Sequence, residues 1–143
     1  MARLSESAAS LRFFGDDLDP EKLTRLLGSE PSIGRRKGES YWSRGAQAEK
    51  VERTGSWRLW TEKRSPGDLD GQIAELLSPL SQDLAVWRDL SARFQADIFC
   101  GLFLDKSNEG IELQPETLVL VGSRGLILDF DIYGNPEPDN DEE

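Results

Sequence analysis

The chain has 143 residues, of which 37% are hydrophobic, and it carries a formal net charge of −10 with one cysteine and no histidine. This length is enough for a single domain with its own hydrophobic core. A Ser-His-Asp triad, a Cys/His zinc site and an internal disulfide are all excluded, because each requires residues that the sequence lacks. The negative charge also disfavours nucleic acid as a partner, since a phosphate backbone attracts clustered Lys and Arg.

The sequence predicts neither a membrane span nor a secretory signal. Its apolar runs are far shorter than the roughly 18 residues that a spanning helix requires. The first residues contain no apolar stretch of the kind found in signal peptides. We therefore expect a cytoplasmic protein that has no membrane partner.

The first structured segment combines a strand, an acidic turn and a capped helix. Residues 1–7 have no clear pattern and are expected to be a frayed leader. Residues 9–14 are rich in strand formers. A short helix is predicted to follow, with Asp19 as its N-cap and Gly28 as its C-cap.

The next segment, residues 29–38, is predicted to be a loop with three adjacent cations, Arg35, Arg36 and Lys37, between glycines. Backbone N–H groups and positive charges presented together are able to bind an anion. The spacing of a P-loop is absent. Two interpretations therefore stay open: a small-anion or nucleotide site, or a solvated basic loop.

The middle of the chain contains two strands and then the longest helical region. Strands are predicted from Tyr41 onward and over residues 56–62, separated by a polar stretch of undetermined structure. Residues 68–94 have apolar residues at helical spacing, interrupted by Pro79. Because proline removes a backbone hydrogen bond and clashes with the preceding turn, we expect either a kink or two helices with Ser78 as the second N-cap.

The last third of the chain alternates between strand and helix periods. Residues 94–105 and 126–133 are predicted strands whose even-numbered side chains face the core. A hairpin-like loop over 106–110 and a third helix beginning at Pro115 lie between them. The apolar residues of this third helix are Leu118, Val119 and Val121.

This order of elements predicts the α+β class. The expected architecture is a two-layer sandwich, a ferredoxin-like variant with helices on one face of a mainly antiparallel sheet. One domain would span residues 8–134. The acidic, proline-containing tail, residues 135–143, is expected to be disordered.

Six sequence segments, distributed over nearly the whole predicted domain, resemble one known family. They are LRFFGDDLDP at residues 11–20, GRRKG at 34–38, GSWRL at 55–59, DIFCGLF at 97–103, GIELQPETL at 110–118 and LDFDIYG at 128–134. In this order they resemble a bacterial family of small domains, the domain of unknown function 4279 family. The resemblance implies no established activity and carries over no catalytic residue.

The sheet face that the helices leave uncovered is the candidate interaction surface. Because side chains alternate along a strand, one set of residues shares this face. The set is Arg12, Phe14, Arg58, Trp60, Phe99, Phe103, Asp129, Asp131 and Tyr133. Contiguous aromatic surface marks a partner, a ligand or another part of the same chain folded over it. The polar stretch 45–54, the tail and a second copy in a homodimer are the alternatives to a protein partner.

We therefore expect a non-enzymatic protein-interaction domain with an acidic and aromatic surface. An immunity-type inhibitor of a basic toxin is one specific form. The alternative is a small-anion or nucleotide-binding domain that uses loop 34–38. RNA binding has little support, since Asp129 and Asp131 would repel phosphates.

An enzyme built from this sequence would need paired carboxylates, because no histidine is available for acid–base chemistry. Asp129 and Asp131 share a strand face, and Asp16 and Asp17 would lie near them if the first and last strands adjoin. Such oxygen ligands suit Mg²⁺ or Ca²⁺. Capping is the favoured role of the acidic turn, so no catalytic residue, cofactor or metal site is predicted, and the question of enzymatic activity stays open.

Overall fold

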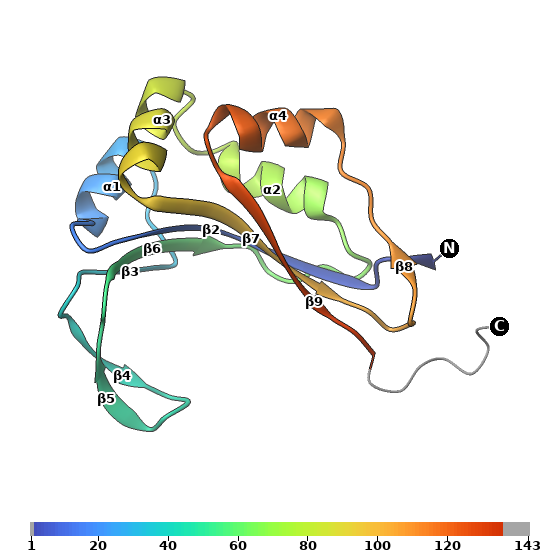
Figure 1. Cartoon of the computed structure of the whole chain (residues 1–143), viewed down its shortest axis with the longest axis horizontal. Coiled ribbons are helices and arrows are strands. Elements are labelled where there is room, and N and C mark those ends of the chain that lie inside the picture. The colour runs from blue at the N-terminus through green and yellow to red at the C-terminus, as the bar shows by residue number, and fades with distance from the viewer. Residues whose placement is uncertain (1, 136–143) are drawn as a thin grey trace.

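The computed structural model describes residues 2–135 as a layer of helices packed on a β-sheet. The helices are α1 (Pro20–Leu27), α2 (Leu69–Leu77), α3 (Leu84–Arg93) and α4 (Pro115–Ser123). All of them lie on the same face of the sheet (Figure 1). None of the helices in this part of the chain is long and apolar enough to cross a membrane.

The main sheet has five strands in the order β3-β6-β2-β7-β9, and β2 lies at its centre. The strands are β1 (Ala2–Arg3), β2 (Glu6–Gly15), β3 (Ile33–Arg35), β4 (Ser40–Ser43), β5 (Ala48–Val51), β6 (Gly55–Trp60), β7 (Gln95–Phe103), β8 (Glu109–Gly110) and β9 (Ile127–Tyr133). Neighbours in the main sheet are antiparallel, except that β7 and β9 are parallel. Outside it, β1 pairs with β8 and β4 pairs with β5. The predicted two-layer α+β class is confirmed.

The core between the two layers is built around large aromatic side chains. Phe13, Trp57 and Trp87 are completely buried. The Phe13 ring lies 5.9 Å from the Trp57 ring, edge to face, and 6.2 Å from the Trp87 ring, between centroids. Each indole N–H has a partner: Trp57 donates to the Thr24 hydroxyl at 3.1 Å, and Trp87 donates to the Ser81 carbonyl at 2.8 Å. These contacts fix β2 and β6 against α1 and α3.

The region 68–94 forms two helices interrupted at Pro79, which is one of the two predicted alternatives, but the second helix begins later than expected. Ser78 is the C-cap of α2, so the prediction that it starts the second helix is wrong. Proline is common just after a C-cap because it cannot continue the helix, and Pro79 occupies this position. Asp83 caps α3 instead, by accepting a hydrogen bond from the backbone N–H of Ala85 at 3.0 Å.

Residues 2–7 belong to the fold, whereas a frayed leader was expected over residues 1–7. The side chain of Ser7 is fully buried, and its hydroxyl donates to Gln72 Oε1 at 2.6 Å. The Gln72 amide in turn donates to the Ser7 carbonyl at 3.0 Å. Glu109 accepts hydrogen bonds from the backbone N–H and the hydroxyl of Ser5, at 2.8 and 2.7 Å. These partners are distant in sequence, so no local pattern indicated them.

Most of the tail that was expected to be disordered, residues 136–143, lies outside the described residues.

The helix α4 presents a different side to the core than its apolar residues predicted. Thr117 and Val121 are buried, whereas Leu118 and Val119 are 52% and 65% exposed. The Thr117 hydroxyl donates to the Asp70 carboxylate of α2. Of the three apolar residues named for this helix, only Val121 is therefore buried in the core, on the same side of α4 as Thr117.

The outer strand β9 is less covered than its alternating pattern predicted. Phe130 and Ile132 were expected in the core but are 40% and 61% exposed. The reason is that β9 is an edge strand, which runs from the end of α4 away from the helix layer (Figure 1).

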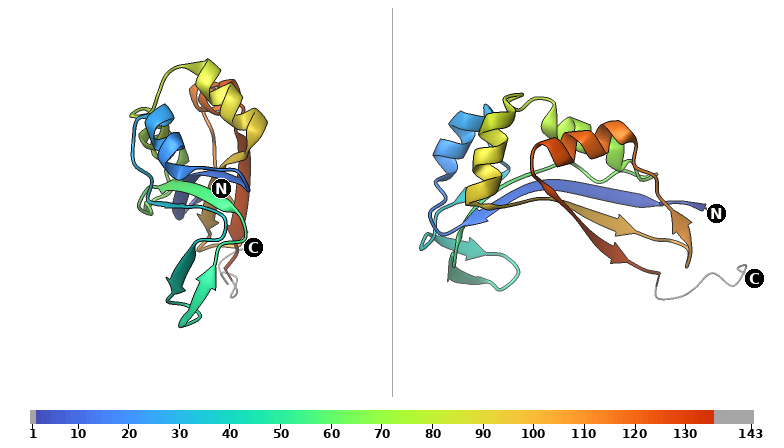
Figure 2. Two further views of the ribbon diagram at one scale, coloured as in Figure 1. Left: turned by 90° about the vertical axis from the view of Figure 1, so that its left-hand side faces the viewer. Right: turned by 45° about the horizontal axis from the view of Figure 1, so that its top comes forward.

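The β4–β5 hairpin projects from the sheet on the side opposite to the helices (Figure 2). Residues 44–51 are all exposed. Trp60 and Tyr133, which lie on the uncovered sheet face, remain 47% and 49% exposed. The polar stretch 45–54 therefore leaves Trp60 and Tyr133 accessible and does not cover the whole face, although its Glu52 contacts Arg35 at the β3 edge.

We expect Phe13→Ala to unfold at a much lower urea concentration than the native chain. The change removes a fully buried ring that contacts two tryptophans, and such core truncations cost about 3–5 kcal/mol. Phe14→Ala is the matched control, because Phe14 is the next residue but points to the uncovered face, so its loss should be distinctly smaller. Urea denaturation followed by circular dichroism measures both, and equal losses would contradict the assigned strand faces.

Candidate binding site on the open face of the sheet

The sheet face opposite the helices, called the open face below, contains every residue predicted for the interaction surface. The strand register sets this arrangement: Arg12 of β2 lies opposite Arg58 of β6 and Asp97 of β7, and Phe99 lies opposite Asp129 of β9. The predicted residues brought together are Arg12, Phe14, Arg58, Trp60, Phe99, Phe103, Asp129, Asp131 and Tyr133. Their role in binding stays a prediction.

An ion pair between Arg12 and Asp97 occupies the centre of the open face. Arg12 Nε and Nη2 donate to the two carboxylate oxygens of Asp97, each at 2.8 Å. The Asp97 side chain is only 3% exposed, so Arg12 neutralises a carboxylate that water cannot solvate. The hydrogen bonds to Asp97 are the main reason that the pKa of Arg12 is raised above its usual value, while burial opposes the shift. A second carboxylate, Asp129, lies 3.7 Å from Arg12 Nη2.

Aromatic rings surround this ion pair and stack on neighbouring cations. The Arg12 guanidinium lies 4.2 Å from the centroid of the Phe99 ring. Further along the face, Lys63 Nζ lies 4.3 Å from the Phe103 ring, which stacks on Tyr133 with centroids 4.8 Å apart. The rings are therefore held in defined positions by one another and by the cations.

The β9 side of the open face is acidic. The side chain of Asp129 is 50% exposed, and the Asp131 carboxylate accepts a hydrogen bond from the Tyr133 hydroxyl at 2.6 Å. That hydrogen bond, together with the negative charge of Asp131, raises the pKa of Tyr133. Because these two carboxylates stand on an accessible strand, this side attracts a cationic group.

The β6 side of the open face holds polar groups that have no partner. Arg58 lies in register between Arg12 of β2 and Ile33 of β3. Its Nε is buried without a hydrogen-bond partner among residues 2–135. Ser56, two residues earlier on the same face, is 3% exposed, and its hydroxyl also lacks a partner in this part of the chain. A buried polar group without a partner is costly, so the described chain alone leaves this part of the face incompletely hydrogen-bonded.

Arg35 lies in a strand, although the sequence predicted a loop. The strand β3 pairs with β6, and Arg35 lies opposite Ser56. Its guanidinium lies 3.9 Å from the Tyr41 ring and donates to Glu52 at 3.0 Å. Arg35 thus fastens the base of the hairpin to the sheet.

Arg36 and Lys37, the other two cations of the predicted anion site, are paired with the acidic turn. Arg36 Nη2 lies 2.8 Å from the Asp19 carboxylate, and Lys37 Nζ lies 3.3 Å from that of Asp16. An anion would have to displace these carboxylates. The anion-binding hypothesis for the basic loop stays a prediction, but the three cations are directed to three different partners.

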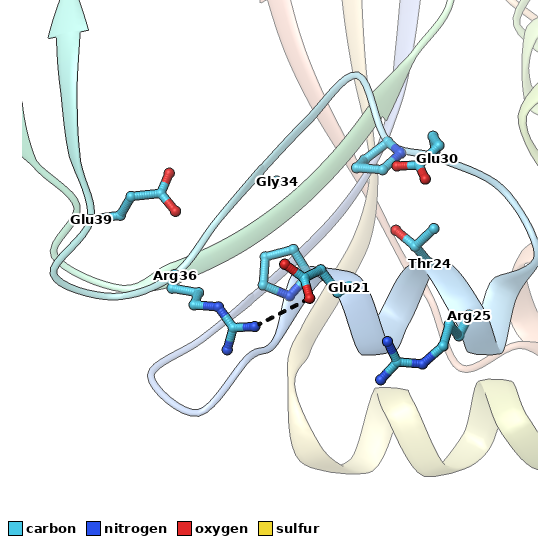
Figure 3. A pocket seen from close by; sticks show the side chains of 9 residues that line it. Glu21, Thr24, Arg25, Glu30, Gly34, Arg36 and Glu39 are labelled. Atoms are coloured by element: carbon cyan, nitrogen blue, oxygen red, sulfur yellow. Dashed lines mark ion pairs between the residues drawn. The ribbon is translucent and has the colours of Figure 1, made fainter.

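A groove of about 490 Å³ lies between α1 and the segment that leads through β3 (Figure 3). Its charged lining consists of Glu21, Arg25, Glu30, Arg36 and Glu39. Arg36 lies 3.8 Å from Glu21 within the groove. Because carboxylates outnumber guanidinium groups in this lining, the groove does not favour an anion.

The carboxylates considered as metal ligands lie in separate places. The strand β7 lies between β2 and β9, so the first and last long strands do not adjoin as that hypothesis required. Asp16 follows the end of β2 at the turn, whereas Asp129 stands on β9. Asp19 has the predicted capping role, since it accepts a hydrogen bond from the backbone N–H of Glu21 at 3.1 Å. Within residues 2–135 no group of three or more His, Cys, Asp or Glu residues is placed to hold a metal ion.

The sequence prediction of the open face omitted several polar residues, among them Asp97, Ser56 and Arg35. The first two had a usable signal, because Asp97 alternates in phase with Phe99 and Ser56 with Arg58. Arg35 had no such signal, since a strand of three residues is too short to show alternation.

Comparison with known proteins identifies the family. The family model described as Domain of unknown function (DUF4279) matches residues 5–135. The chain belongs to the DUF4279 family. The resemblance seen in the six sequence segments is therefore confirmed, and the match spans the main sheet of this DUF4279 domain together with its helix layer. No curated protein and no solved structure was found to match the chain.

We expect Arg12→Met to destabilise the DUF4279 domain by about 3–5 kcal/mol, because it leaves the Asp97 carboxylate buried without a counter-charge. The double variant Arg12→Met with Asp97→Leu removes that charge as well and should recover most of the loss. Urea unfolding of the native, single-variant and double-variant proteins measures the free energy of unfolding of each and thus the loss and its recovery. A single variant as stable as the native chain would contradict the central role of the ion pair.

Proposed function

We propose that this DUF4279 domain is a non-enzymatic protein-binding domain that contacts its partner through the open face. One observation carries the proposal: the helices and the hairpin leave one face of the sheet uncovered (Figures 1 and 2), and that face carries stacked rings and arginines. Exposed aromatic surface of this kind marks an interaction site more often than plain solvated surface.

The residue types of the open face support a protein as the partner. Trp, Tyr, Phe and Arg are enriched at the centres of protein interfaces and among the residues whose truncation weakens binding most. Arg12 and Phe99 already hold each other in place by stacking, as do Phe103 and Tyr133. Such preorganised side chains lose little conformational entropy when a partner binds.

The charge of the domain supports a partner with a basic region. The sequence carries a net charge of −10, and Asp129 and Asp131 place negative charge on the β9 side of the open face. Opposite charge accelerates association and sets orientation. An immunity-type inhibitor of a basic toxin is one specific form of this proposal. The absence of histidine from the sequence supports the non-enzymatic part.

We expect the double variant Trp60→Ala with Phe103→Ala to lose a protein that the native domain captures from a lysate of its native host. Both side chains stand on the open face, and truncation of central aromatic residues weakens an interface by about tenfold or more. Leu118→Ala is the matched control, because Leu118 is 52% exposed but lies on α4, in the helix layer on the other side of the sheet.

Quantitative mass spectrometry of the captured proteins identifies the partner, and calorimetry with the purified partner gives the affinities. Urea unfolding verifies that both variants remain folded. The control should bind as the native domain does. Undiminished affinity of the double variant would refute the open face as the binding surface.

A further inference from the structure

We propose that Arg58, together with Ser56 and Trp60, forms a subsite for a carboxylate side chain, Asp or Glu, of the partner protein. This inference rests on the proposed function and specifies one chemical requirement of the partner. All three residues alternate onto the open face from β6.

The hydrogen-bonding state of the subsite is the first argument. Arg58 Nε is buried and has no partner within residues 2–135, and the same holds for the Ser56 hydroxyl, in a residue only 3% exposed. The two residues lie about 7 Å apart along the strand, as two-residue neighbours do. Both atoms are buried in the unbound domain, so a carboxylate would bind the partly exposed Arg58 side chain and satisfy its Nε once that side chain turns outward.

The local charge is the second argument. Arg58 lies directly opposite Arg12 across the β2–β6 pair, and like charges in such positions repel. Asp97 neutralises Arg12 through two hydrogen bonds, whereas the structure shows no ion pair for Arg58 among the described residues. Other cations of this region already have carboxylates: Arg35 has Glu52. A bound anion would therefore supply the counter-charge that Arg58 lacks.

The shape of the site selects a carboxylate of a protein rather than a free small anion. A guanidinium presents a planar fork of donors that matches a carboxylate at two points. Trp60, the next residue on this face, is 47% exposed and offers its indole to the apolar part of the incoming side chain. Arg58 lines neither of the grooves of about 490 and 380 Å³ and is partly exposed on the face of the sheet, which is a flat surface rather than a pocket. On such a surface binding strength has to come from a wide protein contact around the carboxylate.

The test uses sodium benzoate as a planar carboxylate probe at constant ionic strength. It is titrated into ¹⁵N-labelled native domain, Arg58→Gln and Arg88→Gln, while NMR follows the arginine Nε–H signals and the amides of residues 56–60. Arg88→Gln is the matched control, because Arg88 is an exposed arginine on α3, in the helix layer. We expect saturable shifts at Arg58 Nε–H and at the amides of 56–60. Binding should weaken about tenfold or more in Arg58→Gln and stay unchanged in Arg88→Gln.

Three results would overturn the inference. They are no saturable shift at Arg58, equal weakening in Arg58→Gln and Arg88→Gln, or binding of inorganic phosphate at Arg58 under conditions where benzoate does not bind. The last result would indicate a site for tetrahedral anions. The benzoate titration does not depend on the identity of the partner. If benzoate fails to bind at Arg58 but the double variant Trp60→Ala with Phe103→Ala still loses the partner, the carboxylate inference fails and the proposed function stands. If benzoate binds at Arg58 while that double variant keeps full affinity, the proposed function fails instead.

Discussion

The open face depends on one interaction, the ion pair between Arg12 and Asp97. Asp97 is almost inaccessible to water, so its carboxylate has to be neutralised where it stands. The two-point geometry holds the Arg12 guanidinium in a single orientation. In that orientation the guanidinium contacts the Phe99 ring and lies 3.7 Å from Asp129. One side chain thereby links β2, β7 and β9 at the centre of the face.

The two faces of the sheet have separate physical roles because the central strand alternates between them. Leu11 and Phe13 point into the helix layer and are fully buried, whereas Arg12 and Phe14 point to the open face. Apolar burial under the helices supplies most of the stabilisation. The aromatic residues of the open face are therefore not required for a core, which leaves them available for contacts with another molecule.

Charge on the open face changes sign along the strand order. Arg58 on β6 has no counter-charge in the described residues, the Arg12–Asp97 pair is neutral, and Asp129 and Asp131 make β9 acidic. Three strand spacings separate β6 from β9, which corresponds to about 14 Å. A complementary partner needs an acidic group at one end of this distance and a basic group at the other. Two opposite charges at a set spacing discriminate between partners better than net charge does.

The sequence by itself determined the local features: the helix cap at Asp19, the strand faces and the aromatic and several of the charged residues on the open face. These depend on backbone geometry within a few residues, so alternation and capping signals reveal them. Only the tertiary structure decided which strands are neighbours. Arg12 and Asp97 are 85 positions apart, β3 is too short to show a pattern, and Thr117 of α4 meets Asp70 of α2. Whether an arginine on this face is neutralised, as Arg12 is, or left without a partner, as Arg58 is, depends on such long-range pairing.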